Sequence, residues 1–286
     1  MCRLFGLSAG REPVSATFWL LDAPDSLAVQ SHREPDGTGL GTFDERGRPV
    51  VFKQPVAAYS DRAFAARARE VRSRTFIAHI RFASTGAVSA ANTHPFEQRG
   101  RLFAHNGVIG EPERIDAELG AERALVHGET DSERFFALIT REIERGRPVG
   151  EAIAAAAHWV ASRLPVLSLN CILTTATELW ALRYPEAHEL HYLRRQAGAG
   201  AGEPLEHRSR SAARIAVRSE HLRRHPSVVV ASEPMDGDPG WRALDAGQLL
   251  HVAEDLAVRI QTVIDRPPAH RLTLAELEGR AAESQA

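Results

Sequence analysis

Residues 128–146 read GETDSERFFALITREIERG, and this stretch, with its neighbours, decides the expected layering of the chain. Its apolar residues recur at helical spacing and the run ends at Gly146, which is typical of an amphipathic helix. Thr130 and Glu133 form a capping-box pattern, in which their side chains accept free N–H groups of the first turn. A second helix is predicted in the alanine-rich residues 148–164, and we expect the two helices to pack together.

Strand-forming sequence lies on both sides of this helical pair. Before it, a short surface helix is expected in 61–72, and strands are predicted in 38–53 (two, around the turn DERGRP), 75–83 and 101–109. After it, strands joined by short turns are predicted in 170–184, 188–195, 227–233 and 247–263. The order of strands, helices and strands favours an α+β fold over alternating βαβ units.

The 286 residues suit a single domain with a sizeable core. We predict that this domain spans residues 2–268 and that a tail, 269–286, holds one short helix in 274–283. The arginine-rich residues 194–225 are expected to form a solvated loop, with a docking surface for an acidic partner as the alternative.

Composition excludes several classes of function. The formal net charge of −2 provides no general attraction to nucleic acids or acidic membranes. The two cysteines are too few for a disulfide framework or a Cys-rich zinc site, which fits a reducing compartment. No segment approaches the roughly 20 apolar residues of a membrane span. We therefore expect a cytoplasmic protein with no nucleic-acid or membrane partner.

Cys2 directly follows the initiator methionine, and this position has two explanations. The first is chance at a tolerant chain terminus. The second is chemical, because removal of Met1 would leave one residue that carries both a thiol and a free α-amine. With reference pKa values of about 8.5 for the thiol and about 7.7–8.0 for the amine, a proton could pass between them near neutral pH with little tuning. The rest of an active site must decide between the two.

Several short stretches contain residues that a strand or loop would not need for packing: Arg33, Arg81, His94, Asn106, Gly107 and Asp131. Each has an ordinary explanation on its own. An Asn-Gly pair is typical of a turn, and a carboxylate in the first turn of a helix is favoured by the helix dipole. His94 and His105 suggest a metal, but no third ligand follows at a familiar spacing, so we expect neither a metal nor another cofactor.

Taken in order, six stretches resemble the class II glutamine amidotransferase family: MCRLFG, HREPDGTG, IRFASTG, NTHPF, HNG and GETDSE, between Cys2 and Glu133. The resemblance implies a fold of the N-terminal nucleophile (Ntn) hydrolase type, a four-layer αββα sandwich. It is greatest to single-domain members, because the remaining strands complete one domain and leave no room for an acceptor-activating domain.

The resemblance also implies roles for individual residues. Cys2 matches the nucleophile, with its own α-amine as the base. Asn106, through its side-chain amide, and Gly107, through its N–H, match the oxyanion site. Arg81 matches the residue that binds the substrate α-carboxylate, and Asp131 the residue that binds the α-ammonium.

The remaining implied residues are less central to the chemistry. Arg33 matches an arginine that orders the nucleophile end of the site, and Phe82, Ser84 and His94 match positions that line the glutamine pocket. Two positions depart from the family pattern, because Glu34 follows Arg33 where glycine is frequent and Phe82 replaces a tryptophan. Both departures concern the pocket rather than the catalytic groups.

This reading predicts an enzyme that cleaves glutamine or another γ-glutamyl amide through a Cys2 thioester and releases glutamate. Two alternatives stay open. One is a glutaminase subunit that supplies ammonia to a separate synthase, and the other is a non-catalytic regulatory subunit that binds glutamine. Cys171 lies in an apolar strand and is expected to be inert.

Overall fold

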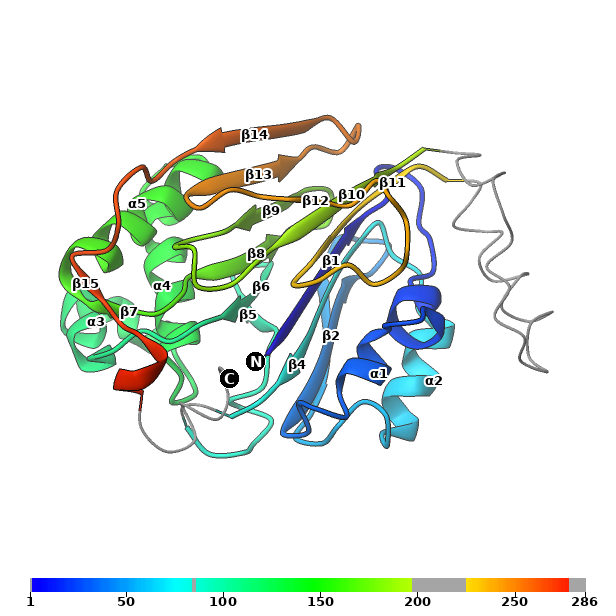
Figure 1. The fold of residues 1–286 in the computed structure, drawn as a ribbon, viewed down its shortest axis with the longest axis horizontal. Helices are drawn as coiled ribbons and strands as arrows, with labels where there is room; N and C mark the ends of the chain where they lie inside the picture. The colour runs from blue at the N-terminus through cyan, green and yellow to red at the C-terminus, as the bar shows by residue number, and fades with distance from the viewer. Residues whose placement is uncertain (1, 84–85, 197–224, 278–286) are drawn as a thin grey trace.

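Two antiparallel sheets form the centre of the molecule (Figure 1), as seen in a computed structural model that describes residues 2–83, 86–196 and 225–277. The first sheet has the order β12-β10-β11-β1-β4-β2-β3, with β1 (Arg3–Ser8), β2 (Gly37–Phe43), β3 (Pro49–Gln54), β4 (Thr75–Arg81), β10 (His191–Arg195), β11 (Ser227–Ala231) and β12 (Arg242–Ala243). The second has the order β14-β13-β9-β8-β6-β5, with β5 (Phe96–Gln98), β6 (Arg101–Asn106), β8 (Asn170–Thr174), β9 (Leu179–Leu182), β13 (Gln248–Val252) and β14 (Val258–Thr262).

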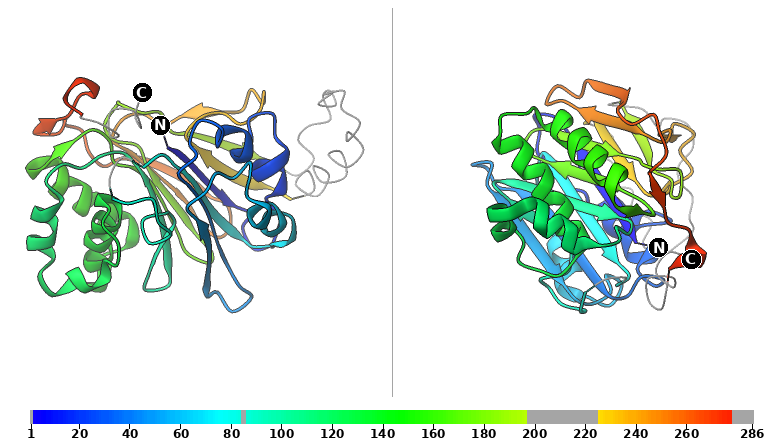
Figure 2. Two further views of the ribbon diagram at one scale, coloured as in Figure 1. Left: turned by 90° about the horizontal axis from the view of Figure 1, so that it is seen from below. Right: turned by 90° about the vertical axis from the view of Figure 1, so that its left-hand side faces the viewer.

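Helices cover the outer face of each sheet, which confirms the predicted four-layer αββα sandwich (Figures 1 and 2). On the first sheet lie a π-helical turn η1 (Phe18–Asp22), α1 (Leu27–Gln30) and α2 (Arg62–Glu70). On the second sheet lie α3 (Pro112–Leu119), a 3₁₀ helix η2 (Gly120–Leu125), α4 (Asp131–Glu144) and α5 (Val149–Arg163).

Strand β1 shows how one sequence serves two apolar layers. Leu4 packs into the layer between the sheets, whereas Phe5 and Leu7 point to the outer face with its helices, as alternation along a strand requires. Gly6 faces the second sheet, and a Cβ there would lie 2.9 Å from Leu179 Cδ1. The absence of a side chain at Gly6 therefore permits the close approach of the two sheets at the middle of β1.

The predicted helical pair is present as α4 and α5, and the capping pattern holds in part. Thr130 is the N-cap of α4, and its Oγ1 accepts a hydrogen bond from the Glu133 N–H at 3.2 Å. The Glu133 carboxylate does not complete the reciprocal box, because its Oε2 accepts from the N–H of Gly128 at 2.6 Å. The helix start is thus fixed from both sides of Thr130.

Several elements differ from the sequence expectation. Neither β1 nor α3 was predicted, because β1 is a short strand buried on both faces and α3 is only eight residues long. In the tail, β15 (His270–Arg271) pairs in parallel with β7 (Pro165–Val166) and precedes a single 3₁₀ turn, η3 (Leu274–Glu276). Residues 278–283 of the predicted tail helix and residues 197–224 of the arginine-rich segment lie outside the described residues. The domain boundary at residue 268 stays a prediction.

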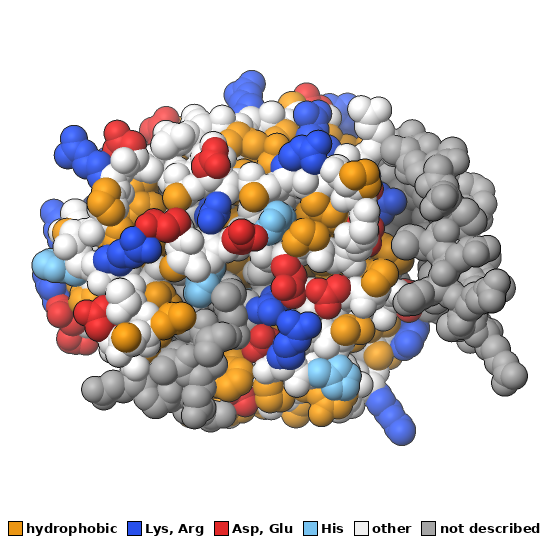
Figure 3. Space-filling model, in the orientation of Figure 1, with side chains coloured by type: hydrophobic (Ala, Val, Ile, Leu, Met, Phe, Trp, Pro, Cys, Tyr) orange, Lys and Arg blue, Asp and Glu red, His pale blue; other side chains and the backbone are white. Residues whose placement is uncertain are grey.

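The visible surface is mixed in charge, as the net charge suggests. Acidic and basic side chains are interspersed over the face shown in Figure 3. Within the described part of the chain, every helix is too short or too polar to cross a membrane.

Candidate active site

Four chain segments that are distant in sequence meet at one end of the sandwich. Strands β1 and β4 are antiparallel neighbours, with Arg3 opposite Ile80, so the start of β1 lies beside the end of β4. The end of β6 and the start of α4 complete the site. Together they form a small pocket lined by Cys2, Arg81, Phe82, His94, His105, Gly107, Thr130, Asp131 and Ser132.

The Cys2 side chain is 7% exposed and lies against the end of β4. The backbone N–H of Phe82 donates a hydrogen bond to the Cys2 Sγ at 3.2 Å, a contact that favours the thiolate. Burial is nevertheless the largest influence and, together with the nearby charge of Glu34, raises the pKa of the thiol to about 11, against the lowering effects of Phe82 and Arg81. The thiol is therefore harder to ionise than the reference pKa values suggest.

Asn106 contacts the backbone of Cys2. Its Nδ2 donates to the carbonyl oxygen of Cys2 at 3.0 Å, and the side chain is buried at the end of β6. An amide nitrogen carries two N–H donors, and this bond uses one of them. The second donor is compatible with an oxyanion that forms beside Cys2.

Gly107 has no room for a side chain. A Cβ at this position would lie 1.9 Å from the carbonyl oxygen of Ser168, which is a backbone atom and cannot move aside easily. Glycine therefore lets the chain leave β6 in close contact with the segment before β8. This approach places the Gly107 backbone in the pocket wall beside Cys2.

Arg81 ends β4 and is 3% exposed. Its Nη1 donates to the carbonyl oxygen of Ala87 at 3.2 Å, which ties the guanidinium to the loop that follows the strand. That loop is held in turn by Asn92 and Glu129, because Glu129 Oε2 accepts from the Ala87 N–H at 3.0 Å and from Asn92 Nδ2 at 3.0 Å. Asn92 Oδ1 accepts from the Glu129 N–H at 2.8 Å, so the two segments fix each other.

Asp131, the first residue of α4, lines the same pocket as Arg81. Its Oδ2 accepts a hydrogen bond from the Ile109 N–H at 2.8 Å, and its side chain is 3% exposed. The bond connects the start of the helix to the segment that follows Gly107. A pocket with a buried guanidinium and a buried carboxylate suits a ligand with both charges, such as an amino-acid head group.

Three buried histidines lie in or next to the pocket. His94 and His105 line it, and the ring of His79 packs against that of His94. His105 Nε2 lies 3.0 Å from the Ser168 carbonyl oxygen, which can only accept, so Nε2 carries the proton and Nδ1 accepts from the Ser132 hydroxyl at 2.9 Å. His94 packs its ring 4.1 Å from the ring of His79 and 4.6 Å from that of Phe96. Burial lowers the pKa of His79 to about 3 and that of His94 well below its usual value, so both are neutral.

Among the described residues, Arg33 and Asn106 were predicted for the site but are not in the pocket lining. Asn106 still contacts the Cys2 backbone next to the pocket. Arg33 has an exposed side chain, and its charge lowers the pKa of the neighbouring Glu34 against the larger raising effect of burial. Ser84 lies outside the described residues. The sequence reasoning missed Asn92, Glu129 and Arg3 as parts of the site, although Asn92 and Glu129 stand within the quoted stretches NTHPF and GETDSE.

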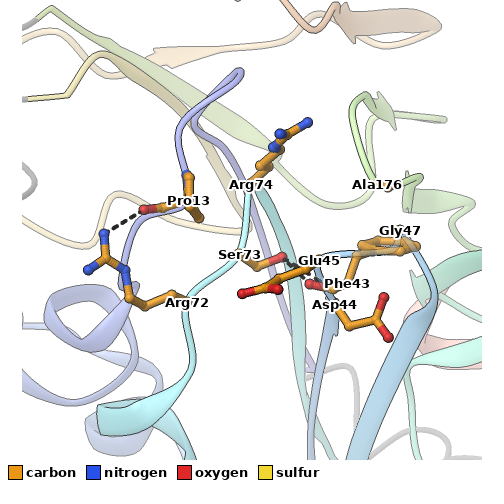
Figure 4. A pocket seen from close by; sticks show the side chains of 9 residues that line it. All are labelled: Pro13, Phe43, Asp44, Glu45, Gly47, Arg72, Ser73, Arg74 and Ala176. Carbon is orange, nitrogen blue, oxygen red and sulfur yellow. Dashed lines mark hydrogen bonds between the residues drawn. The ribbon is translucent and has the colours of Figure 1, made fainter.

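Other hollows on the surface lie away from these groups. One lies between the β2–β3 turn and the segment before β4, at the opposite end of the strands from Cys2, and is lined by Pro13, Phe43, Asp44, Glu45, Gly47, Arg72, Ser73, Arg74 and Ala176 (Figure 4). The Ser73 hydroxyl there bonds to the backbone of Phe43, and Arg72 donates to the carbonyl oxygen of Pro13 at 2.9 Å. These polar groups are already bonded to the backbone. In the described ranges, no group of three or more His, Cys, Asp or Glu side chains is placed to hold a metal ion.

Both the sequence and the fold are similar to those of known proteins. The chain is similar to the γ-glutamyl-hercynylcysteine sulfoxide hydrolase of Mycolicibacterium smegmatis, with 26% identity over 85% of this chain and 92% of that protein. It is similar to the glutamine–fructose-6-phosphate aminotransferase of Shigella flexneri with 29% identity over 54% of this chain but 24% of that protein. The solved glutamine phosphoribosylpyrophosphate amidotransferase of B. subtilis shares the fold, with a TM-score of 0.64 and 17% identity, over 93% of this chain and 50% of that one.

The likeness to that solved structure supports an Ntn-hydrolase type of sandwich. The family model for class II glutamine amidotransferases matches residues 1–273, which is nearly the whole chain. The protein is therefore an enzyme of the class II glutamine amidotransferase family.

Proposed function

We propose that this enzyme hydrolyses γ-glutamyl amides, with Cys2 as the nucleophile after removal of Met1. The observation that carries the proposal is the pocket itself, which gathers the Cys2 thiol, the Arg81 guanidinium and the Asp131 carboxylate from three distant segments. Arg81 would bind the α-carboxylate of the glutamyl group and Asp131 its α-ammonium. Both charges on the protein are buried, so a peptide-bound glutamine that lacks them would leave the protein charges poorly matched.

The reaction follows from these positions. The Cys2 Sγ attacks the γ-carbonyl carbon while its proton passes to the Cys2 α-amine, and the carbonyl oxygen becomes an oxyanion beside Asn106 Nδ2 and the Gly107 N–H. When the tetrahedral intermediate collapses, the C–N bond breaks and the leaving amine takes the proton from the Cys2 ammonium. Water then attacks the thioester carbonyl carbon and gives one proton to the Cys2 α-amine. The C–S bond breaks, the departing thiolate takes that proton back from the Cys2 ammonium, and glutamate is released.

We further propose that the preferred substrate has an amine larger than ammonia. Support comes from coverage: the chain matches 92% of a relative named as a γ-glutamyl hydrolase, but 24% of a relative named as an aminotransferase. If hydrolysis of a larger γ-glutamyl amide is itself the purpose of the enzyme, its activity need not be kept low in the absence of a partner. A glutaminase that feeds a separate synthase would waste glutamine unless it were nearly inactive alone.

A panel assay tests both parts of the proposal. Purified protein is incubated with glutamine and with γ-glutamyl amides of larger amines, and glutamate release is measured, with the Cys2→Ala variant as the control. We expect kcat/KM to be at least tenfold higher on some larger amide, which corresponds to about 1.4 kcal/mol of transition-state binding. Strong activity on glutamine with no better substrate would favour an ammonia supplier. No release from any compound would contradict the hydrolase proposal and favour a regulatory subunit.

A further inference from the structure

Glu34 is a buried carboxylate beside the nucleophile that the proposed reaction does not use. It is 2% exposed, although it lies in a loop and follows the exposed Arg33. Its Oε1 lies 3.3 Å from Nη1 of Arg3, which also donates to the carbonyl oxygen of Cys2 at 3.5 Å. A carboxylate is costly to bury unless the site uses its charge.

Arg3 is not the sole cation that acts on Glu34, because the positive charge of the chain terminus also lowers the pKa of its carboxyl group. The guanidinium of Arg3 serves two carboxylates, because its Nε lies 2.8 Å from Glu233 Oε1, closer than its contact with Glu34. The negative charge of Glu34 also acts on the Cys2 thiol and raises its pKa. A carboxylate that disfavours the thiolate is a disadvantage for a thiol nucleophile, unless it stabilises another charge that forms in the same step.

We propose that Glu34 is a positioning residue that holds the α-ammonium of Cys2. This inference rests on the proposed function. Glu34 already interacts with the positive charge of the chain terminus, and Arg3 Nη1 contacts both Glu34 and the Cys2 carbonyl oxygen. When Met1 is gone and the thiol proton passes to the Cys2 amine, the new ammonium takes the place of that terminal charge, while the thiolate lies beside the Phe82 N–H. The carboxylate keeps the proton on nitrogen until the leaving amine takes it. Glu34 would thus serve the internal base of Cys2 as a carboxylate serves a catalytic histidine.

The charged groups around the Cys2 terminus come from several elements. Arg3 lies on β1, Arg33 precedes Glu34, and Arg81 ends β4, while Glu233 follows β11. Burial and then the nearby charge of Glu233 raise the pKa of Asp25, which lies in the segment before α1. Burial raises the pKa of Glu34, and the positive charges of the chain terminus, Arg3 and Arg33 lower it. Removal of Met1 transfers the terminal charge to Cys2 itself.

The test measures the pKa of the Cys2 amine directly. The chain has two cysteines, so ¹³C-cysteine labelling gives one titrating residue and Cys171 as a buried internal reference. Mass spectrometry first verifies that Met1 is absent. Chemical shifts against pH are then compared for the parent enzyme and for Glu34→Gln, Glu34→Asp and Glu233→Gln, and the acid limb of the kcat/KM profile is recorded for the best substrate of the panel.

We expect Glu34→Gln to lower the amine pKa, and to move the acid limb to lower pH, by about one unit. Glu34→Asp keeps most of the effect because it restores the charge. Glu233→Gln is the matched control, because it removes a carboxylate from the same Arg3 without acting on the thiol, and we expect no shift. An unchanged amine pKa in Glu34→Gln, with a lower melting temperature alone, would reduce Glu34 to a partner of Arg3 and overturn the inference. If the parent enzyme released no glutamate at all, the proposed function would fail while the chemical-shift titration still tested Glu34.

Discussion

Replacing Asn106 by alanine removes an amide that serves both the nucleophile and the proposed oxyanion. The structural cost is modest, because among the described residues this side chain makes one hydrogen bond, from Nδ2 to the Cys2 carbonyl oxygen. Its loss costs about 1–2 kcal/mol of unfolding free energy. The catalytic cost is larger, because removal of one oxyanion donor lowers kcat by about 10²–10³, or about 2.7–4 kcal/mol of transition-state stabilisation.

Asn170 provides the matched control, since it is the direct cross-strand neighbour of Asn106 on β8. Its Nδ2 donates to the carbonyl oxygens of His188 and Glu189, both at 3.2 Å, and its Oδ1 accepts from the Tyr184 N–H at 2.9 Å. With three hydrogen bonds lost, Asn170→Ala should reduce stability by about 2–4 kcal/mol, more than Asn106→Ala. It makes no contact with Cys2, so kcat below its melting temperature should change little.

The assay combines thermal unfolding of both variants with initial rates of glutamate release on the best γ-glutamyl amide. We expect opposite orders, with Asn170→Ala less stable and Asn106→Ala less active, and a smaller change in KM than in kcat for Asn106→Ala. If kcat of Asn106→Ala equalled that of the parent enzyme, the Asn-Gly pair would be only a turn. If activity instead followed stability in both variants, the oxyanion role would also be refuted.

Three further predictions concern the pocket, the two cysteines and His79. Arg81→Ala and Asp131→Asn should raise KM at least tenfold with little change in kcat, because in the proposed mode of binding both charges hold the substrate head group in ground and transition states alike. A change in the melting temperature alone for Asp131→Asn would leave that residue only a helix-terminus role. A glutamine analogue with an electrophilic carbon should label Cys2 and spare Cys171, whose thiol is 1% exposed and has its pKa raised to about 12 by burial, as peptide mass mapping would establish. Burial lowers the pKa of His79 to about 3, so the unfolded chain binds more protons than the folded chain between about pH 6.5 and 3, and stability falls as the pH falls through that range. In urea unfolding at pH 7, 5 and 4, His79→Phe should reduce the loss of unfolding free energy at low pH. The same loss in the parent enzyme and in His79→Phe would contradict the lowered pKa of His79.

Local features of the fold followed from the sequence. The helical pair of α4 and α5 was predictable because amphipathic spacing, a cap at Thr130 and a stop near Gly146 act over a few residues. Most strands were also predictable, because short runs of strand-forming residues bounded by turns are likewise local patterns. Strand β1 was not predicted, because a six-residue strand buried on both faces lacks the alternation that marks a half-buried strand.

For the candidate site, too, some features could be predicted from the sequence and others could not. Residue types in order led to Cys2, Arg81, Phe82, His94, Gly107 and Asp131, which the structure brings together in one pocket. The same reasoning also selected Arg33, whose side chain is exposed. The roles that the family resemblance implies stay predictions. The environment of these side chains was not predictable. The contact of the Phe82 N–H with the Cys2 Sγ joins residues 80 positions apart, and the bonds between Asn92 and Glu129 join residues 37 apart.

By itself, the sequence determined the type of fold, the family and the chemical groups available for catalysis, since those depend on residue identity and short-range pattern. Only the tertiary structure decided how those groups behave. In the fold, burial raises the pKa of the Cys2 thiol, and the buried charge of Glu34 raises it further. Arg33, which directly precedes Glu34, is exposed instead. Such effects depend on which distant segments exclude water from a group and bring charges to it, and the order of residues along the chain does not specify those distances.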